Sequence, residues 1–143
     1  MIRAALLGAG HRGMFAYASY ALKRPDRIQF VAVAEPNEER RKLFSDLHHI
    51  LENMQFESWE ELLSQPKLCE AMLICTQDRD HFQPTMAALR AGYHILLEKP
   101  MSPDPLEAIT MAEEADCQQR ILKICHVSRY STFFRKVKKL LNP

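Results

Sequence analysis

With 143 residues, 47% of them hydrophobic and 26% charged, the chain has the length and composition of one soluble globular domain with a substantial core. Its formal net charge of +1 argues against a broad nucleic-acid or membrane-binding surface, and its apolar runs are too short to span a bilayer. The four cysteines form no C-x-x-C pair, so free thiols are expected in preference to a disulfide or a metal site. Together with the absence of a signal-peptide pattern, this predicts a cytoplasmic protein.

Six strand-like apolar runs alternate with helical patterns along the chain. Several are apolar throughout, which is typical of strands covered by helices on both faces. This alternation predicts an α/β fold, a Rossmann doubly wound parallel sheet with strand order 3-2-1-4-5-6. The predicted strands cover residues 2–7, 28–34, 54–56, 71–76, 93–97 and 121–126.

Capping residues mark most of the predicted helices, which cover residues 14–23, 38–51, 59–64, 80–91 and 105–119. Short polar side chains accept hydrogen bonds from the free N–H groups of a helix's first turn, and glycine adopts the left-handed conformation that ends a helix. The expected caps are Asn37 for 38–51, Ser58 for 59–64, Asp80 or Asp78 for 80–91 and Asp104 for 105–119, with Gly92 after 80–91.

The first predicted strand runs into Gly8-Ala9-Gly10-His11-Arg12-Gly13, a G-x-G-x-x-G pattern followed by a helix. In this context the first glycine allows a tight turn, the second lets the backbone approach a pyrophosphate, and the third lets helix and strand pack closely. The helix dipole favours negative charge at the turn. We therefore predict a dinucleotide site here; a turn without a ligand and a site for a methyl-donor nucleotide are the alternatives.

Glu35 ends the second predicted strand, 22 positions after Gly13. A carboxylate at this place accepts hydrogen bonds from the adenosine ribose hydroxyls and repels a 2′-phosphate, which favours NAD over NADP. Arg40 and Arg41 follow and could reach a 2′-phosphate, so NADP is the alternative cofactor. A solvated acid at the end of a strand is the structural alternative for Glu35.

Thr76 and Gln77 follow the fourth predicted strand, at the carboxyl edge where doubly wound sheets bind their ligands. We expect Thr76 and the backbone after it to line the nicotinamide half of the site. His81 lies in the first turn of the next helix, where the dipole favours a neutral, hydrogen-bonding imidazole over a cationic one. A purely structural His81 is the alternative.

Glu98, Lys99 and Pro100 emerge from the fifth predicted strand at the same edge. We expect Glu98 near the reactive end of the cofactor. Lys99 could hydrogen-bond a substrate hydroxyl and help move its proton as hydride leaves. The alternative is an exposed Glu-Lys pair after a strand. Farther on, the basic segment Arg135-Lys136-Val137-Lys138-Lys139 follows a helical pattern, which indicates a solvated amphipathic face more than a nucleic-acid patch.

Together these motifs resemble the N-terminal domain of the glucose–fructose oxidoreductase / inositol dehydrogenase / MocA-type dehydrogenases. The most specific part of the resemblance is Ala88-Leu89-Arg90-Ala91-Gly92-Tyr93-His94 running into Glu98-Lys99-Pro100. It implies hydride transfer between NAD(P) and a CH–OH group of a sugar or polyol, with Lys99 as the catalytic residue. It also implies that Arg129 reaches the cofactor cleft. Many relatives have Thr-Pro where this chain has Thr76-Gln77, a departure expected to alter loop rigidity more than binding.

Members of this family continue into a second α/β domain that holds most of the substrate pocket, and this chain stops where that domain would begin. We therefore expect residues 1–143 to form an NAD(P)-binding domain that binds cofactor but turns over little substrate alone. The surface that a second domain would cover is expected to favour self-association. A non-catalytic NAD(P)-sensing or partner-binding module is the main alternative, since a fold does not settle function.

Overall fold

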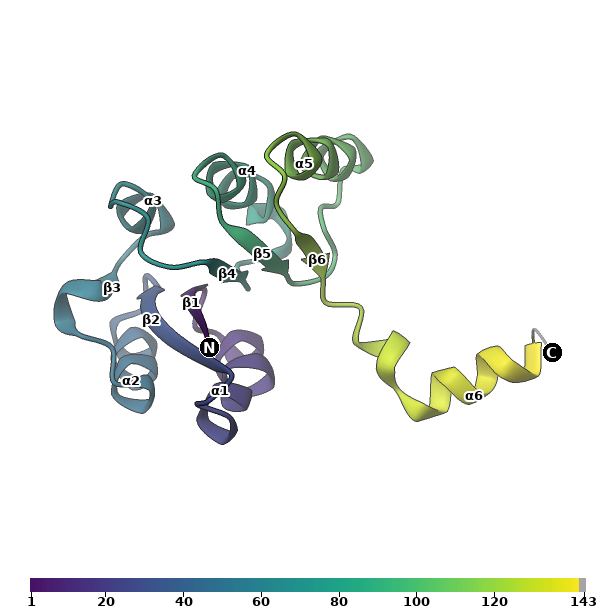
Figure 1. Cartoon of the computed structure of the whole chain (residues 1–143), viewed down its shortest axis with the longest axis horizontal. Helices are drawn as coiled ribbons and strands as arrows, with labels where there is room; N and C mark the ends of the chain where they lie inside the picture. Colours follow the sequence, from purple (N-terminus) through teal and green to yellow (C-terminus); the bar gives the residue numbers. More distant parts are fainter. Residues whose placement is uncertain (142–143) are drawn as a thin grey trace.

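Six parallel strands form the centre of the computed structural model, which describes residues 1–141 (Figure 1). The strand order is β3-β2-β1-β4-β5-β6, so the predicted doubly wound Rossmann topology is confirmed. The strands are β1 (Ile2–Leu7), β2 (Ile28–Ala34), β3 (Gln55–Phe56), β4 (Ala71–Ile74), β5 (His94–Leu97) and β6 (Leu122–Ile124).

Helices cover both faces of this sheet: α1 and α2 lie on one face, and α3, α4 and α5 lie on the other (Figure 1). A short π-helix, η1, leads from the glycine turn into α1. The helical segments are η1 (Arg12–Ala18), α1 (Ser19–Lys23), α2 (Glu38–His48), η2 (Glu52–Met54), α3 (Trp59–Leu63), η3 (Asp78–Asp80), α4 (Phe82–Arg90), α5 (Pro105–Cys117), η4 (Val127–Tyr130) and α6 (Thr132–Leu141).

The apolar strands are buried on both faces. Leu6 packs with Met14 and Phe30 on the side of α1 and α2, whereas Leu7 packs with Ile74 on the opposite side. Successive side chains of a strand point to opposite faces, so a strand covered twice needs apolar residues at every position. This explains why the strands read as continuous apolar runs.

Three of the expected caps are present. The side chains of Asn37, Ser58 and Asp104 accept hydrogen bonds from the first turns of α2, α3 and α5. Gly92 follows α4 with φ +81°, as expected of the residue that ends a helix. The expected Asp cap on α4 is wrong: residues 78–80 form a separate 3-10 turn, and in the described chain no side chain caps α4.

Several elements are shorter than the sequence predicts. Helix α2 ends at His48 because His49 adopts a left-handed φ of 55°, and Ile50 N then donates back to Ser45 O. Strands β4 and β6 end two residues early, at Ile74 and Ile124, because the chain turns into loops at the carboxyl edge of the sheet. These loops are where the candidate site lies.

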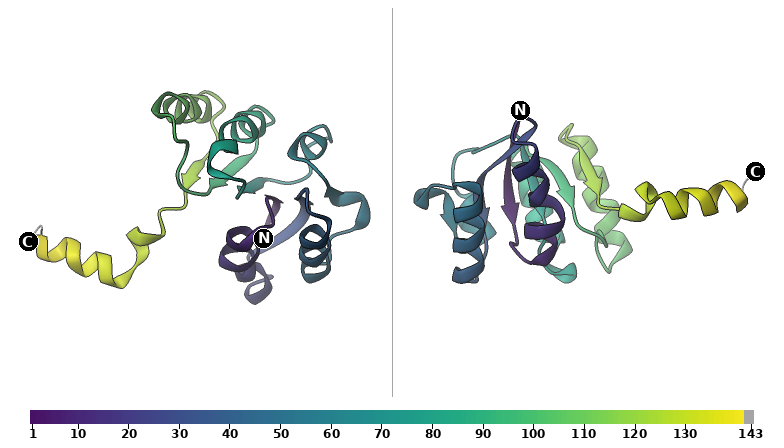
Figure 2. Two further views of the ribbon diagram at one scale, coloured as in Figure 1. Left: turned by 180° about the vertical axis from the view of Figure 1, so that it is seen from behind. Right: turned by 90° about the horizontal axis from the view of Figure 1, so that it is seen from below.

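Helix α6 projects away from the sheet and its covering helices (Figures 1 and 2). It packs against η4, and no residue of this helix is buried in the described chain. Within residues 1–141, none of the helices has both the length and the apolar character needed to cross a bilayer.

Candidate functional site

The carboxyl edge of the sheet carries a row of five residues, one directly after each of the strands β2, β1, β4, β5 and β6. Each donates its backbone N–H to the neighbouring strand, with N···O distances of 2.8–3.1 Å, so the row continues the regular ladder. In sheet order the row is Glu35, Gly8, Cys75, Glu98 and Cys125. The first glycine of the turn therefore lies between two carboxylates that are 63 positions apart in sequence.

Two glycines of the turn are required by its geometry. Gly8 has φ +88°, and a Cβ there would lie 2.6 Å from the Cys75 carbonyl oxygen. A Cβ on Gly13 would collide with the Gly8 carbonyl oxygen. Gly10 differs, because the nearest neighbour of a Cβ there would be the Arg40 guanidinium at 4.0 Å. The open space beside Gly10 is what the close approach of a pyrophosphate requires.

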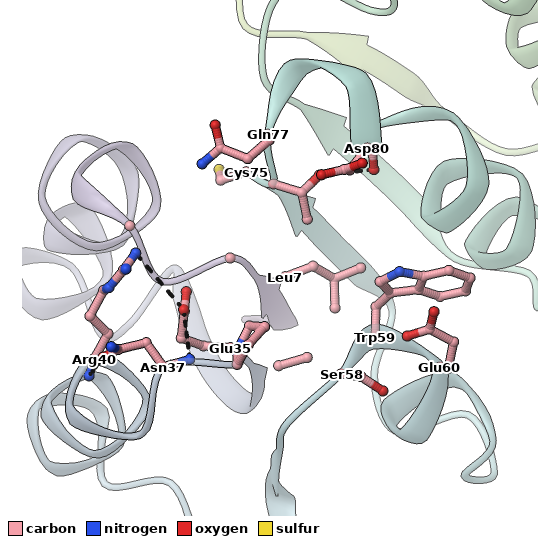
Figure 3. Close-up of a pocket in the computed structure, with 15 residues that line it drawn as sticks. Leu7, Glu35, Asn37, Arg40, Ser58, Trp59, Glu60, Cys75, Gln77 and Asp80 are labelled. Carbon is pink, nitrogen blue, oxygen red and sulfur yellow. Dashed lines mark hydrogen bonds and ion pairs between the residues drawn. The ribbon is translucent and has the colours of Figure 1, made fainter.

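The Glu35 carboxylate lies over the glycine turn and is 5% exposed. Its Oε2 accepts from Ala9 N at 2.7 Å, and its Oε1 accepts from Asn37 N at 3.1 Å. Arg40 Nη1 lies 3.9 Å from Oε1 (Figure 3). The structural alternative, a merely solvated strand-end acid, does not fit the described structure, because backbone donors from both sides hold this carboxylate in place.

The two arginines after Glu35 differ in orientation. Arg40 lines the pocket beside the turn, and its side chain is 54% exposed. Arg41 folds back: its guanidinium donates to the Glu35 carbonyl oxygen at 2.6 Å and contacts Glu57 at 3.4 Å. Of the two, Arg40 is the one placed to meet a phosphate on the adenosine ribose.

A pocket of about 490 Å³ opens beside the turn and Glu35. Arg40 and the indole of Trp59 lie at opposite sides of it (Figure 3). Thr76 and Gln77 line this same pocket, so the expected contact of Thr76 with the nicotinamide half stays a prediction. The lining residues are Leu7, Gly8, Gly10, Ala34, Glu35, Pro36, Asn37, Arg40, Ser58, Trp59, Glu60, Cys75, Thr76, Gln77 and Asp80.

Sequence reasoning missed the contribution of α3 to this pocket. Ser58, Trp59 and Glu60 were interpreted as a helix start, although they also follow β3 at the carboxyl edge. The position of a strand end at this edge is the signal that could have identified them. An indole beside an open pocket provides a flat apolar surface for a planar ring.

His81 connects two loops and is fully buried. Its Nδ1 lies 2.7 Å from the Pro100 carbonyl oxygen, and its Nε2 lies 3.3 Å from the Thr76 carbonyl oxygen. Both partners are carbonyl oxygens, which accept hydrogen bonds, so a protonated ring nitrogen donates to the loop that it faces. His81 thus holds the loop after β4 against the loop after β5, and its direct contact with a cofactor stays a prediction.

Glu98 lies farther along the row, next to Cys125, and is buried, with 5% of its surface exposed. Its Oε1 accepts from Arg12 Nε at 2.5 Å, and its Oε2 accepts from the Tyr17 hydroxyl and from Lys99 N, each at 2.9 Å. Burial alone would raise the pKa of this carboxyl, but the hydrogen bonds outweigh burial and hold the pKa below its ordinary value. Burial raises the pKa of Tyr17, so the phenol stays protonated and donates.

Three other predicted site residues are exposed and lie outside the pocket lining of the described chain. The His11 ring packs on Phe15, with ring centroids 5.4 Å apart. Lys99 lies just beyond Glu98 and precedes a cis peptide bond to Pro100. Arg129 lies in η4, after β6. Their predicted contacts with cofactor and substrate stay predictions.

The Gfo/Idh/MocA profile, described as an oxidoreductase family with an NAD-binding Rossmann fold, matches residues 2–126. The chain belongs to this family. Inositol 2-dehydrogenase from Streptomyces avermitilis is 30% identical to it over 148 aligned positions, which include 99% of this chain and 40% of that protein. The NAD-binding Rossmann assignment is thus shown, and the chain spans about two fifths of this relative's length.

Solved structures agree with the fold. The WlbA dehydrogenase from Chromobacterium violaceum, in complex with NADH and UDP-GlcNAcA, superposes with a TM-score of 0.87 at 21% identity, covering 96% of this chain and 39% of that one. Biliverdin reductase from Synechocystis, in complex with biliverdin and NADP⁺, gives 0.84 at 23% identity, covering 98% and 42%. At identities this low, these structures support the fold alone.

Proposed function

We propose that the carboxyl edge binds NAD, with the adenosine in the pocket beside Glu35 and the nicotinamide toward Glu98 and Lys99. The observation that carries this proposal is the open space at Gly10 beside a carboxylate held by Ala9 N. The pocket supplies an acceptor for ribose hydroxyls at Glu35 and an aromatic surface at Trp59. Bound NAD would supply the hydride acceptor, and the protein would hold and orient it.

The reaction that we propose for the intact protein is the oxidation of a CH–OH group of a sugar or polyol. Lys99 is exposed at the reacting end of the row, where its ammonium could hydrogen-bond the substrate hydroxyl and help to move its proton. Under the same proposal, the residues that select the substrate are not among the residues of this chain. A non-catalytic NAD(P)-sensing module is the second candidate, favoured by a pocket that the glycine turn, Glu35 and Trp59 line together.

The methyl-donor alternative is not retained, because the matching family consists of NAD-binding oxidoreductases. We further propose that the protein resides in the cytoplasm. All four of its cysteines are free thiols, which a reducing compartment maintains.

Isothermal titration with NAD and NADP side by side tests the proposed site. We expect Gly10→Val to weaken NAD binding about 100-fold or more, roughly 3 kcal/mol, because the side chain would occupy the space of the pyrophosphate. The apo fold should tolerate this change, since a Cβ at Gly10 meets no atom closer than 4.0 Å. The matched control is Ala112→Val on the exposed side of α5. Unchanged NAD affinity in Gly10→Val would refute the proposed site.

A further inference from the structure

Both oxygens of the Glu98 carboxylate are occupied by donors from one helix and from the next residue. Arg12 and Tyr17 belong to η1, and they reach across 86 and 81 positions of sequence to this one side chain. Arg12 also donates from Nη2 to the Tyr17 hydroxyl at 2.8 Å and stacks over the Tyr17 ring at 5.1 Å. The three side chains form one closed cluster, the Arg12–Tyr17–Glu98 cluster.

The π-helical form of η1 explains how Arg12 and Tyr17 reach the same carboxylate. They are five positions apart, and in an α-helix of about 3.6 residues per turn such residues lie on different faces. A π-helix closes its hydrogen bonds from i to i+5, so position i+5 returns toward the face of position i. π-helical turns are rare and frequently occur at functional sites. The helix start after the glycine turn is therefore shaped so that both side chains point to Glu98.

Burying a carboxylate is unfavourable unless an opposite charge and hydrogen bonds compensate. The Arg12 guanidinium and the Tyr17 hydroxyl provide this compensation for Glu98. The Glu98 carboxylate also accepts from Lys99 N, so its position determines the backbone direction at Lys99. Arg12, which the sequence assigns to cofactor binding, directs Nε and Nη2 into the cluster. The cluster therefore connects the pyrophosphate turn to the loop that carries Lys99.

We propose that Tyr17 is a positioning residue which, with Arg12, holds the Glu98 carboxylate and thereby fixes the Lys99 loop against the nicotinamide half of the cofactor. This inference rests on the proposed function and deepens it. It makes the nicotinamide end a preformed part of the domain, before any substrate-binding segment contributes. Tyr17 acts through Glu98 and is not itself a catalytic residue.

The test compares NADH with ADP-ribose, which has the adenosine and pyrophosphate but lacks the nicotinamide. In Tyr17→Phe the ring is kept and the hydroxyl donor to Glu98 is lost. We expect the Kd for NADH to rise about three- to tenfold, because only part of the free energy of the lost hydrogen bond is expressed in binding, with the Kd for ADP-ribose unchanged. Unchanged ADP-ribose binding also shows that the variant is folded. Tyr20→Phe, at an exposed tyrosine of α1, is the matched control.

Nicotinamide fluorescence gives a second readout that a purely structural role would not move. Immobilised reduced nicotinamide changes its emission, and we expect this change to be smaller in Tyr17→Phe at saturating NADH. If Tyr17 acts through Glu98, Tyr17→Phe should add little in a Glu98→Gln background, so the two changes should be non-additive.

The outcomes separate this inference from the proposed function. A wild-type protein that binds neither ligand refutes the proposed function itself. Binding of both ligands with equal affinity in the wild type, or equal losses for both in Tyr17→Phe, or no loss at all, overturns the positioning role while leaving the dinucleotide site intact. Additive effects of Tyr17→Phe and Glu98→Gln would also overturn it.

Discussion

We propose that Glu35 is the residue on which the choice between NAD and NADP depends. Its carboxylate stands over the turn, and Arg40 lies in the same pocket with an exposed guanidinium. Shortening Glu35 to Ser removes an acceptor for the ribose hydroxyls and the repulsion of a 2′-phosphate, while Arg40 remains. We expect Glu35→Ser to raise the affinity for NADP relative to NAD about tenfold.

Parallel titrations with both dinucleotides measure this ratio. The ratio is informative even though Ser no longer accepts from Ala9 N, because a loosened turn weakens both ligands alike. Glu38→Ser, at an exposed position of α2, is the matched control. A ratio that stays at its wild-type value would remove Glu35 from cofactor selection.

His48 makes the stability of the domain depend on pH. Its ring is 8% exposed and packs against Phe44 and Phe30 at centroid distances of 4.4 and 5.2 Å. Burial, with a smaller contribution from nearby His49, lowers the pKa of His48 from its ordinary 6.5. Because the unfolded chain binds this proton more readily, the contribution of His48 to stability is complete above pH 6.5 and decreases as the pH falls toward the folded-state pKa.

Urea unfolding at several pH values between 5 and 8 measures this effect. We expect His48→Leu to reduce the loss of unfolding free energy on the acid side, and His126→Leu, at an exposed histidine, to leave it in place. If His48→Leu and the wild type lose stability in parallel, burial of His48 does not control the acid response.

Within residues 1–141, the apolar face of helix α6 is left largely exposed. Phe133, Leu140 and Leu141 are 67%, 70% and 75% exposed. A helix of ten residues is marginal in water unless it packs against something. We therefore expect the chain to self-associate through α6 as its concentration rises.

Sedimentation velocity over a range of protein concentrations checks this expectation. Phe133→Glu combined with Leu140→Glu should shift the protein toward monomer, whereas Lys136→Gln on the same helix should not. A monomer at every concentration in the wild type would show that the apolar face of α6 does not associate.

The six strand regions were predictable because they are largely apolar, several of them throughout, and alternate with helical patterns. The ends of the helices and strands were less predictable. Helix α2 stops at His48 because of a left-handed residue that carries no glycine signal, and α4 begins without the expected Asp cap. Where such a helix begins or ends depends on its tertiary contacts, and local sequence propensity does not determine these contacts.

For the whole molecule, we predict that the 143-residue chain binds NAD but does not oxidise a polyol at an appreciable rate. The described residues provide the cofactor edge and an exposed Lys99, and under our proposal the residues that enclose a substrate lie beyond this chain. We expect no polyol-dependent formation of NADH above background, measured as absorbance at saturating NAD. Robust turnover by the 143-residue chain would show that it is a complete enzyme and overturn this expectation.

The amino-acid pattern alone determined the parallel sheet and its strand order, because strand-like and helical runs alternate along the chain, and it predicted a site at Gly8–Gly13, Glu35 and Glu98 from local glycine spacing and strand-end acids. The tertiary structure decided which side chains meet there. It turned Arg12 toward Glu98, folded Arg41 away from the pocket, buried His81 between two loops and brought Trp59 to the pocket. These contacts join residues far apart in sequence, so they exist only once the sheet has brought the strand ends together at one edge.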